Sequence, residues 1–104
     1  MKKLIPLLVA SFAVFASGAA FADGEAALNK SGCMACHAKD KKLVGPSFKD
    51  IAAKYKGQDV SAKLFDKVRK GGSGVFGPIP MSPNGPDKIA DPDLKDAIAV
   101  ILKS

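Results

Sequence analysis

The sequence predicts a single small all-α domain that follows an export signal, and three observations lead to this prediction. First, Lys2 and Lys3 precede an uncharged apolar run that ends in an Ala-x-Ala pattern at Ala22, as in a secretory signal peptide. Second, apolar residues recur at helical spacing in the rest of the chain, and no stretch alternates as a strand does. Third, the 82 residues that follow this signal (104 − 22) are enough for one domain with a modest core. We therefore expect cleavage that removes residues 1–22 and leaves a domain over residues 23–104; an uncleaved membrane anchor is the alternative.

Four helices are expected in this domain, and two of them lie in its first half. The first runs from Asp23, a possible N-cap, to about Gly32. The second begins after Ser47, which forms a capping-box-like start with Asp50, and ends near Gly57. Its apolar face, at i, i+3, i+4 and i+7, comprises Phe48, Ile51, Ala52 and Tyr55.

The third and fourth helices follow the same reasoning. Asp59 or Ser61 caps the third helix, and Gly71-Gly72 ends it. Its inward residues are Val60, Leu64 and Val68. The fourth begins at Asp91-Pro92-Asp93, where a capping residue precedes proline at the first helical position. Its apolar face comprises Leu94, Ile98, Ile101 and Leu102.

A long segment without helical periodicity, "GGSGVFGPIPMSPNGPD", separates the last two helices. Its prolines and glycines exclude helix, and we expect no regular sheet there either. Long loops in small domains are usually functional or disordered. Because its centre, Phe-Gly-Pro-Ile-Pro-Met, is too apolar for a solvated linker, we expect this segment to pack against something.

The chemistry is concentrated in Cys33-Met34-Ala35-Cys36-His37, which holds both cysteines and the only histidine of the chain. Cys-x-x-Cys-His is the attachment sequence for c-type haem. The spacing places both thiols on one side of a helical turn, where they can form thioethers, and directs His37 to the iron. We therefore predict one covalently bound haem c per chain, held by Cys33 and Cys36. The alternatives are a redox dithiol, which needs a βαβ context, a zinc site, which needs four ligands, and a buried histidine beside two unrelated cysteines.

The second axial position of the iron has few possible occupants. Met34 lies inside the attachment loop on the wrong side, so Met81, a lysine, Tyr55, water or nothing remain. A methionine in an apolar segment is often core filler. Elimination and the flanking prolines favour Met81 as the axial ligand opposite His37.

Three stretches, "CMACH", "GPSFKDIAAKYKG" and "GVFGPIPMSPN", resemble the short bacterial class I cytochromes c of the c-551/c-552 type. The resemblance covers essentially all of residues 23–104 and implies a small four-helix class I cytochrome c fold, with the first and last helices crossing, around one haem. It implies Met81 as distal ligand and a hydrogen bond from the His37 imidazole to the Pro46 carbonyl, which fixes the ring. It also places Arg69 near a haem propionate.

The sequence departs from the family at two aromatic positions. The family usually has tryptophan where Phe76 stands, and often another where Val100 stands. Phe76 can pack on the porphyrin, but it cannot donate the hydrogen bond that tryptophan makes to a propionate.

These features predict an electron carrier rather than an enzyme. A His/Met-ligated iron has no open position for substrate, and this ligation raises the reduction potential. By resemblance, we expect a monomeric periplasmic shuttle from a quinol-oxidising complex to a nitrite reductase, terminal oxidase or peroxidase, without stable membrane association. The alternative is a peroxidase or gas sensor with a labile methionine ligand.

The charge pattern narrows the class of partner. Lysine and arginine outnumber aspartate and glutamate by 16 to 10, but the basic residues are scattered. No basic run is interleaved with aromatic residues, which argues against nucleic-acid binding. The positive bias would instead steer acidic redox proteins to weak, transient docking. By family geometry, docking would use the haem edge near Met34, Ala35, Val44 and the Pro78–Pro80 segment.

Overall fold

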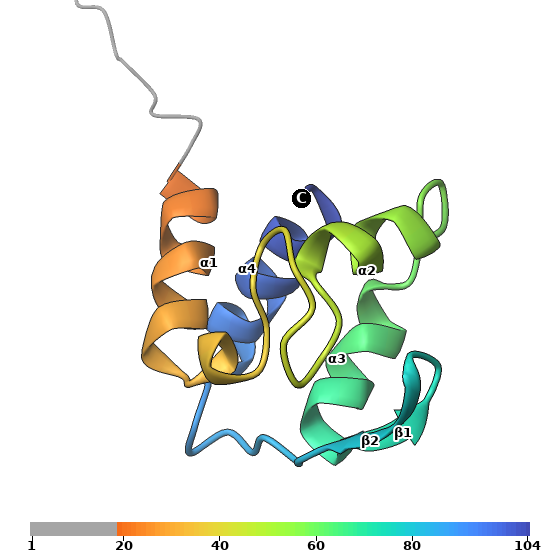
Figure 1. The fold of residues 1–104 in the computed structure, drawn as a ribbon. Coiled ribbons are helices and arrows are strands. Elements are labelled where there is room, and N and C mark those ends of the chain that lie inside the picture. The colour runs from red at the N-terminus through yellow and green to blue at the C-terminus, as the bar shows by residue number, and fades with distance from the viewer. Residues whose placement is uncertain (1–18) are drawn as a thin grey trace, which may run out of the picture.

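The computed structural model describes the backbone of residues 19–104 and the side chains of residues 23–104 (Figure 1). Most of the predicted signal peptide therefore lies outside the described residues. The elements, in chain order, are α1 (Ala19–Lys30), the 3₁₀ turn η1 (Cys33–Ala35), α2 (Phe48–Lys54), α3 (Ser61–Lys70), β1 (Gly72–Gly74), β2 (Gly77–Met81) and α4 (Asp91–Leu102). The four predicted helices are thus all present. In the described part of the chain, no helix has both the length and the apolar character needed to span a bilayer.

The two terminal helices, α1 and α4, pack against each other, as expected. Their contact is close at Gly24, where a Cβ atom would lie 2.6 Å from both the Asp96 carbonyl oxygen and Val100 Cγ2. Only glycine allows this approach of the two backbones. The buried core continues from this contact into α2 and the segment before α4, and it comprises Ala27, Leu28, Phe48, Ile51, Tyr55, Val60, Ile89, Leu94, Ala97, Ile98 and Val100.

Helix α2 begins as predicted. Ser47 is the N-cap residue, and its hydroxyl oxygen accepts a hydrogen bond from the Asp50 backbone N–H at 3.0 Å. This bond satisfies one of the N–H groups that a helix start leaves without a partner. Ser47 itself is buried, so the cap anchors the start of α2 inside the protein.

Three predicted caps were wrong. Helix α1 begins at Ala19, so Asp23 lies within the helix, because the alanine-rich residues before it are good helix formers. The N-cap of α3 is Val60, which makes no side-chain capping bond. The N-cap of α4 is Ala90, and the Asp91 carboxylate is held instead by Arg69. A tertiary ion pair therefore replaces the expected local cap.

The expectation that the Gly/Pro-rich segment contains no regular sheet was also wrong. β1 and β2 form an antiparallel hairpin, in which Gly72 pairs with Met81 and Gly74 pairs with Gly77 across an irregular register. All three glycines have positive φ angles, between 108° and 123°, which lets the chain reverse within a few residues. The prolines of β2 are compatible with pairing because each strand of a two-stranded sheet is an edge strand. Figure 1 shows the hairpin directly after α3.

Candidate functional site

A cavity of about 830 Å³ lies between α3, the hairpin, α4 and the segment that follows α1. Its volume is in the range of roughly 300–1,000 Å³ that is typical of small-molecule and cofactor pockets. The lining is predominantly apolar and draws side chains from every helix. The larger apolar residues in it are Leu28, Val44, Phe48, Ile51, Tyr55, Leu64, Val68, Val75, Phe76, Ile79, Leu94, Ile98 and Ile101.

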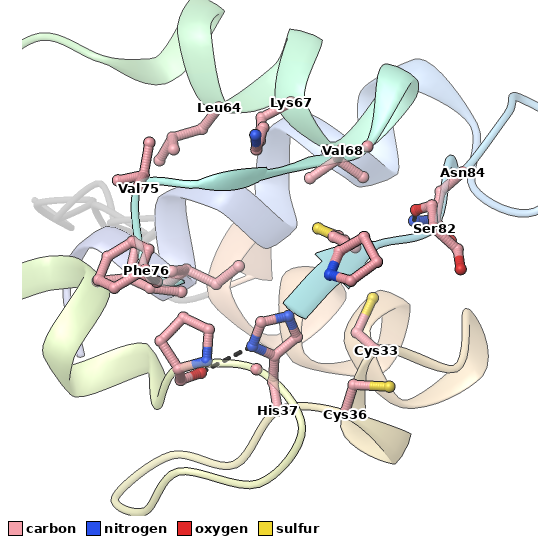
Figure 2. Close-up of a pocket in the computed structure, with 18 of the residues that line it drawn as sticks. Cys33, Cys36, His37, Leu64, Lys67, Val68, Val75, Phe76, Ser82 and Asn84 are labelled. Atoms are coloured by element: carbon pink, nitrogen blue, oxygen red, sulfur yellow. Dashed lines mark hydrogen bonds between the residues drawn. The ribbon is translucent and has the colours of Figure 1, made fainter. Parts of the chain in front are cut away.

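The two cysteines and the histidine lie together at one wall of the cavity (Figure 2). Gly32, with φ 78°, turns the chain from α1 into η1, and the amides of Cys36 and His37 then bond to the Cys33 carbonyl at 3.2 and 3.0 Å. This tight turn brings both thiols and the imidazole to the same cavity. Cys33 is half-buried and Cys36 exposed, and both thiols are free.

Burial raises the pKa of the Cys33 thiol above its ordinary value, and the neighbouring Cys36 adds to the rise. A protonated thiol in an apolar wall is weakly nucleophilic. This environment differs from that of a catalytic redox cysteine, whose pKa is lowered.

The His37 imidazole is held by three neighbours. Its Nδ1 donates a hydrogen bond to the Pro46 carbonyl oxygen at 2.7 Å, shown as the dashed line in Figure 2. The ring of Phe48 stacks on it with 5.5 Å between centroids. A Cβ atom at Gly45 would lie 2.6 Å from Cε1 of the ring. Because a carbonyl can only accept, Nδ1 carries the proton and Nε2 keeps its lone pair for a metal.

Met81 ends β2, is half-buried, and lines the same cavity as His37. Its backbone lies against the end of α3, since a Cβ atom at Gly71 would overlap the Met81 carbonyl oxygen. Figure 2 places Leu64 and Val68 of α3 across the cavity from Cys33, Cys36 and His37. The Met81 segment is thus attached to the α3 side of the cavity.

Phe76 and Pro46 also line the cavity. The Phe76 ring meets the Tyr55 ring edge-on, with 6.5 Å between centroids, and Lys54 Nζ lies 5.8 Å from the centroid of Phe76. Phe76 thereby holds an aromatic position at the cavity wall while remaining 38% exposed.

Arg69 is the predicted site residue that the structure does not bring to the cavity. Its guanidinium donates to the carbonyl oxygens of Asn84 and Ile89 at 3.1 and 2.8 Å, and it forms an ion pair with Asp91. The Arg69 side chain therefore joins α3 to the start of α4 rather than to the cavity.

Two further residues of the site were missed by sequence reasoning. Lys67 is half-buried and lines the cavity, on the face of α3 formed by Leu64, Lys67, Val68 and Gly71. These four residues follow the i, i+3, i+4, i+7 spacing, so the helical face that predicted Leu64 and Val68 also pointed to Lys67 and away from Arg69. The second missed residue is Gly45, whose only sequence signal was its place before Pro46.

The donor set of the cavity fits a covalently attached haem. Two thiols are available for thioether bonds, and an imidazole nitrogen and a thioether sulfur are available as iron ligands. The apolar lining suits a porphyrin, and the half-buried Lys67 supplies a positive charge at the cavity wall. The thiols and the imidazole come from one stretch of the sequence, whereas Lys67 and Met81 come from two others.

Comparisons with known proteins agree with this geometry. The Cytochrome c family model matches residues 21–104. The chain is 47% identical to cytochrome c-551 of Pseudomonas aeruginosa over 78 residues, which are 74% of this chain and 75% of the relative. It is 46% identical to cytochrome c-552 of Nitrosomonas europaea over 87 residues, which are 83% and 82% of the two chains. The crystal structure of wild-type Nitrosomonas europaea cytochrome c552 superposes with a TM-score of 0.69 at 42% identity, over 76% of this chain and 96% of that one. The chain therefore belongs to the cytochrome c family, as a class I cytochrome of the c-551/c-552 type with covalently bound haem c.

Proposed function

We propose that this electron carrier is exported to the periplasm, where it moves single electrons between respiratory protein complexes. The observation that supports the proposal most is the presence of His37 and Met81 at one cavity, so that the chain itself can fill both axial positions. Bound haem supplies a one-electron iron couple. Electron transfer also requires rigid surroundings that contain little water, and the apolar lining of the cavity provides them.

Each site residue has a definite role in this proposal. The Cys33 and Cys36 thiols form the thioether bonds that keep the cofactor attached. The Nε2 atom of His37 and the sulfur of Met81 are the axial ligands. The Pro46 carbonyl holds the His37 ring in one orientation, since Nδ1 donates to it at 2.7 Å.

The polar end of the cofactor needs a cation, and we assign that role to Lys67. Lys67 is half-buried in the cavity wall, whereas Arg69 is engaged with Asn84, Ile89 and Asp91. Phe76 contributes apolar contact in place of the hydrogen bond that tryptophan would make. The propionate environment is therefore less polar than a tryptophan-containing site would be.

Docking would use the apolar residues around the mouth of the cavity. Exposed apolar side chains line the cavity there, and they comprise Val44, Val75, Phe76 and Ile79. Scattered lysines would steer an acidic partner toward this surface at short range. We propose a quinol-oxidising complex as donor and a nitrite reductase, terminal oxidase or peroxidase as acceptor, with a monomeric carrier released by cleavage after Ala22.

Ligand binding to the holoprotein tests the proposal. A carrier with both axial positions filled binds carbon monoxide when reduced, and cyanide when oxidised, only weakly and slowly, while it accepts and releases one electron reversibly. Rapid, tight binding of either ligand at neutral pH would favour a peroxidase or gas sensor instead.

A further inference from the structure

Arg69 is the only arginine in the chain, and its side chain is mostly buried. Its side chain is only 13% exposed, whereas that of the next residue, Lys70, is 74% exposed. The guanidinium carbon lies 5.0 Å from the centroid of the Phe65 ring, one turn earlier on α3. A buried, stacked guanidinium at a single position indicates a requirement for the planar, five-donor group of arginine.

The partners of this guanidinium lie at three points along residues 84–91. Nη1 donates to the carbonyl oxygens of Asn84 and Ile89, and Nη2 pairs with the Asp91 carboxylate in the first turn of α4. One side chain of α3 thereby fixes the segment between the hairpin and α4 at Asn84, at the buried residue Ile89, and at the helix start. Lysine has a single nitrogen and could not meet these partners together.

The segment fixed in this way is the one that carries Met81. The Met81 backbone touches Gly71, the residue that caps the end of α3. Three residues after Met81, the Asn84 amide donates a hydrogen bond to the Val68 carbonyl at 2.9 Å. Arg69, at the same end of α3, donates a hydrogen bond to the Asn84 carbonyl. The last turn of α3 therefore holds the chain on the C-terminal side of Met81 over a short span.

We propose that Arg69 is a positioning residue for Met81, one that keeps the methionine sulfur at the cavity by clamping residues 84–91 to α3. The inference rests on the proposed role of Met81 as axial ligand. Without the clamp, Ile89 would still anchor the end of the segment in the core, but the part next to Met81 would be held only by the Asn84–Val68 backbone bond and the short hairpin. The population with Met81 displaced would rise, and an added ligand would bind more tightly in proportion, because its apparent affinity scales with the competent fraction.

Cyanide titration of the oxidised holoprotein tests this inference in Arg69→Lys, Arg69→Ala and a control, Lys95→Ala. Lys95 is exposed and lies outside the cavity lining, so its removal should change the dissociation constant less than about twofold. Both Arg69 variants should bind cyanide at least about 10-fold more tightly than the wild type, given the strength of hydrogen bonds to charged groups. Arg69→Lys keeps the test valid if Arg69→Ala does not fold.

A second readout separates positioning from general stability. In the Arg69 variants, the far-red absorption band of the ferric iron–methionine bond should disappear at a lower temperature than the helical far-UV circular dichroism signal. The difference between these two temperatures should be larger than in the wild type. Unchanged cyanide affinity, or loss of both signals in parallel, overturns the inference while leaving Met81 ligation intact. Absence of the band from the wild-type protein would overturn both the inference and the proposed role of Met81.

Discussion

The Nδ1 atom of His37 donates a hydrogen bond of 2.7 Å to the carbonyl oxygen of Pro46, nine residues further along the chain. The loop between them is closed by backbone bonds, from the Gly45 amide to the Cys36 carbonyl and from the Phe48 amide to the Ala38 carbonyl. Because the loop is held at both ends, the carbonyl stays in line with the ring. With His37 as the iron ligand, this bond would increase electron donation from the imidazole and so stabilise the oxidised iron.

Replacement of Pro46 by alanine should raise the reduction potential. Alanine keeps the carbonyl but loosens the backbone that aims it, so the bond to His37 weakens and the oxidised state is less stabilised. Loss of up to about one hydrogen bond's net free energy corresponds to a rise of about 20–60 mV for a one-electron couple. Voltammetry would measure the change, with Pro86→Ala, an exposed proline outside the cavity lining, as the control. A lower potential in Pro46→Ala would contradict this reasoning.

Replacement of Gly45 by alanine should destabilise the protein. The new Cβ would lie 2.6 Å from His37 Cε1, and the ring cannot retreat from it, because Phe48 stacks on the ring and Pro46 holds Nδ1. Overpacking of this kind costs about 1–3 kcal/mol of unfolding free energy. Denaturant titration of the holoprotein would measure it.

Gly85→Ala is the matched control for Gly45→Ala. A Cβ atom at Gly85 would meet Asp87 Oδ1 at 2.7 Å, which is the end of an exposed, flexible side chain that can move away. Its unfolding free energy should therefore change little. If both glycine variants were equally stable, close approach of Gly45 to the imidazole would not constrain the ring.

Replacement of Met81 by alanine should leave the haem attached, since Cys33 and Cys36 hold it covalently. The potential should fall on the order of 100 mV, because loss of the thioether removes the ligand that favours reduced iron. Met34→Ala is the control, since Met34 is exposed and lies within the attachment turn. Equal potentials for Met81→Ala and the wild type would remove Met81 from the ligand role.

Electron transfer to an acidic redox protein should slow as salt is added. Without Lys2 and Lys3, which the predicted cleavage removes, 14 basic residues oppose 10 acidic ones, a formal net charge of +4, and most lysines of residues 23–104 are exposed. The Debye length shortens from about 30 Å at 0.01 M to about 8 Å at 0.15 M ionic strength, which screens steering between the partners. Stopped-flow rates measured over this range would reveal the effect. Rates that do not change with salt would assign docking to the apolar residues alone.

Periodic and local signals predicted most of the helical fold. The spacing of Phe48 and Ile51, with Ser47 before them, was sufficient to place α2 and its cap, because all the partners lie within one turn. The start of α4 at Asp91 was predicted, but its cap was misassigned because the Asp91 carboxylate is used by Arg69, 22 residues away, and no local pattern encodes such a pairing.

The hairpin and the cavity-lining Lys67 show the limits of sequence reasoning more clearly. Gly72 and Met81 pair through backbone atoms, so the side-chain alternation that identifies strands is missing. Assignment of the propionate cation by resemblance selected Arg69, although helical geometry directs Lys67 to the cavity. The position of Cys33, Cys36 and His37 at one cavity was predictable, because thioether chemistry requires such residues at a fixed short spacing in the chain.

The central claim is that His37 and Met81 together occupy both axial positions of the iron. The optical spectrum of the purified, oxidised protein tests this claim most directly. We expect a weak far-red band from the ferric iron–methionine sulfur bond at neutral pH. A protein that carries haem but lacks this band would have an open or differently ligated iron, which would contradict the assignment of a closed electron carrier.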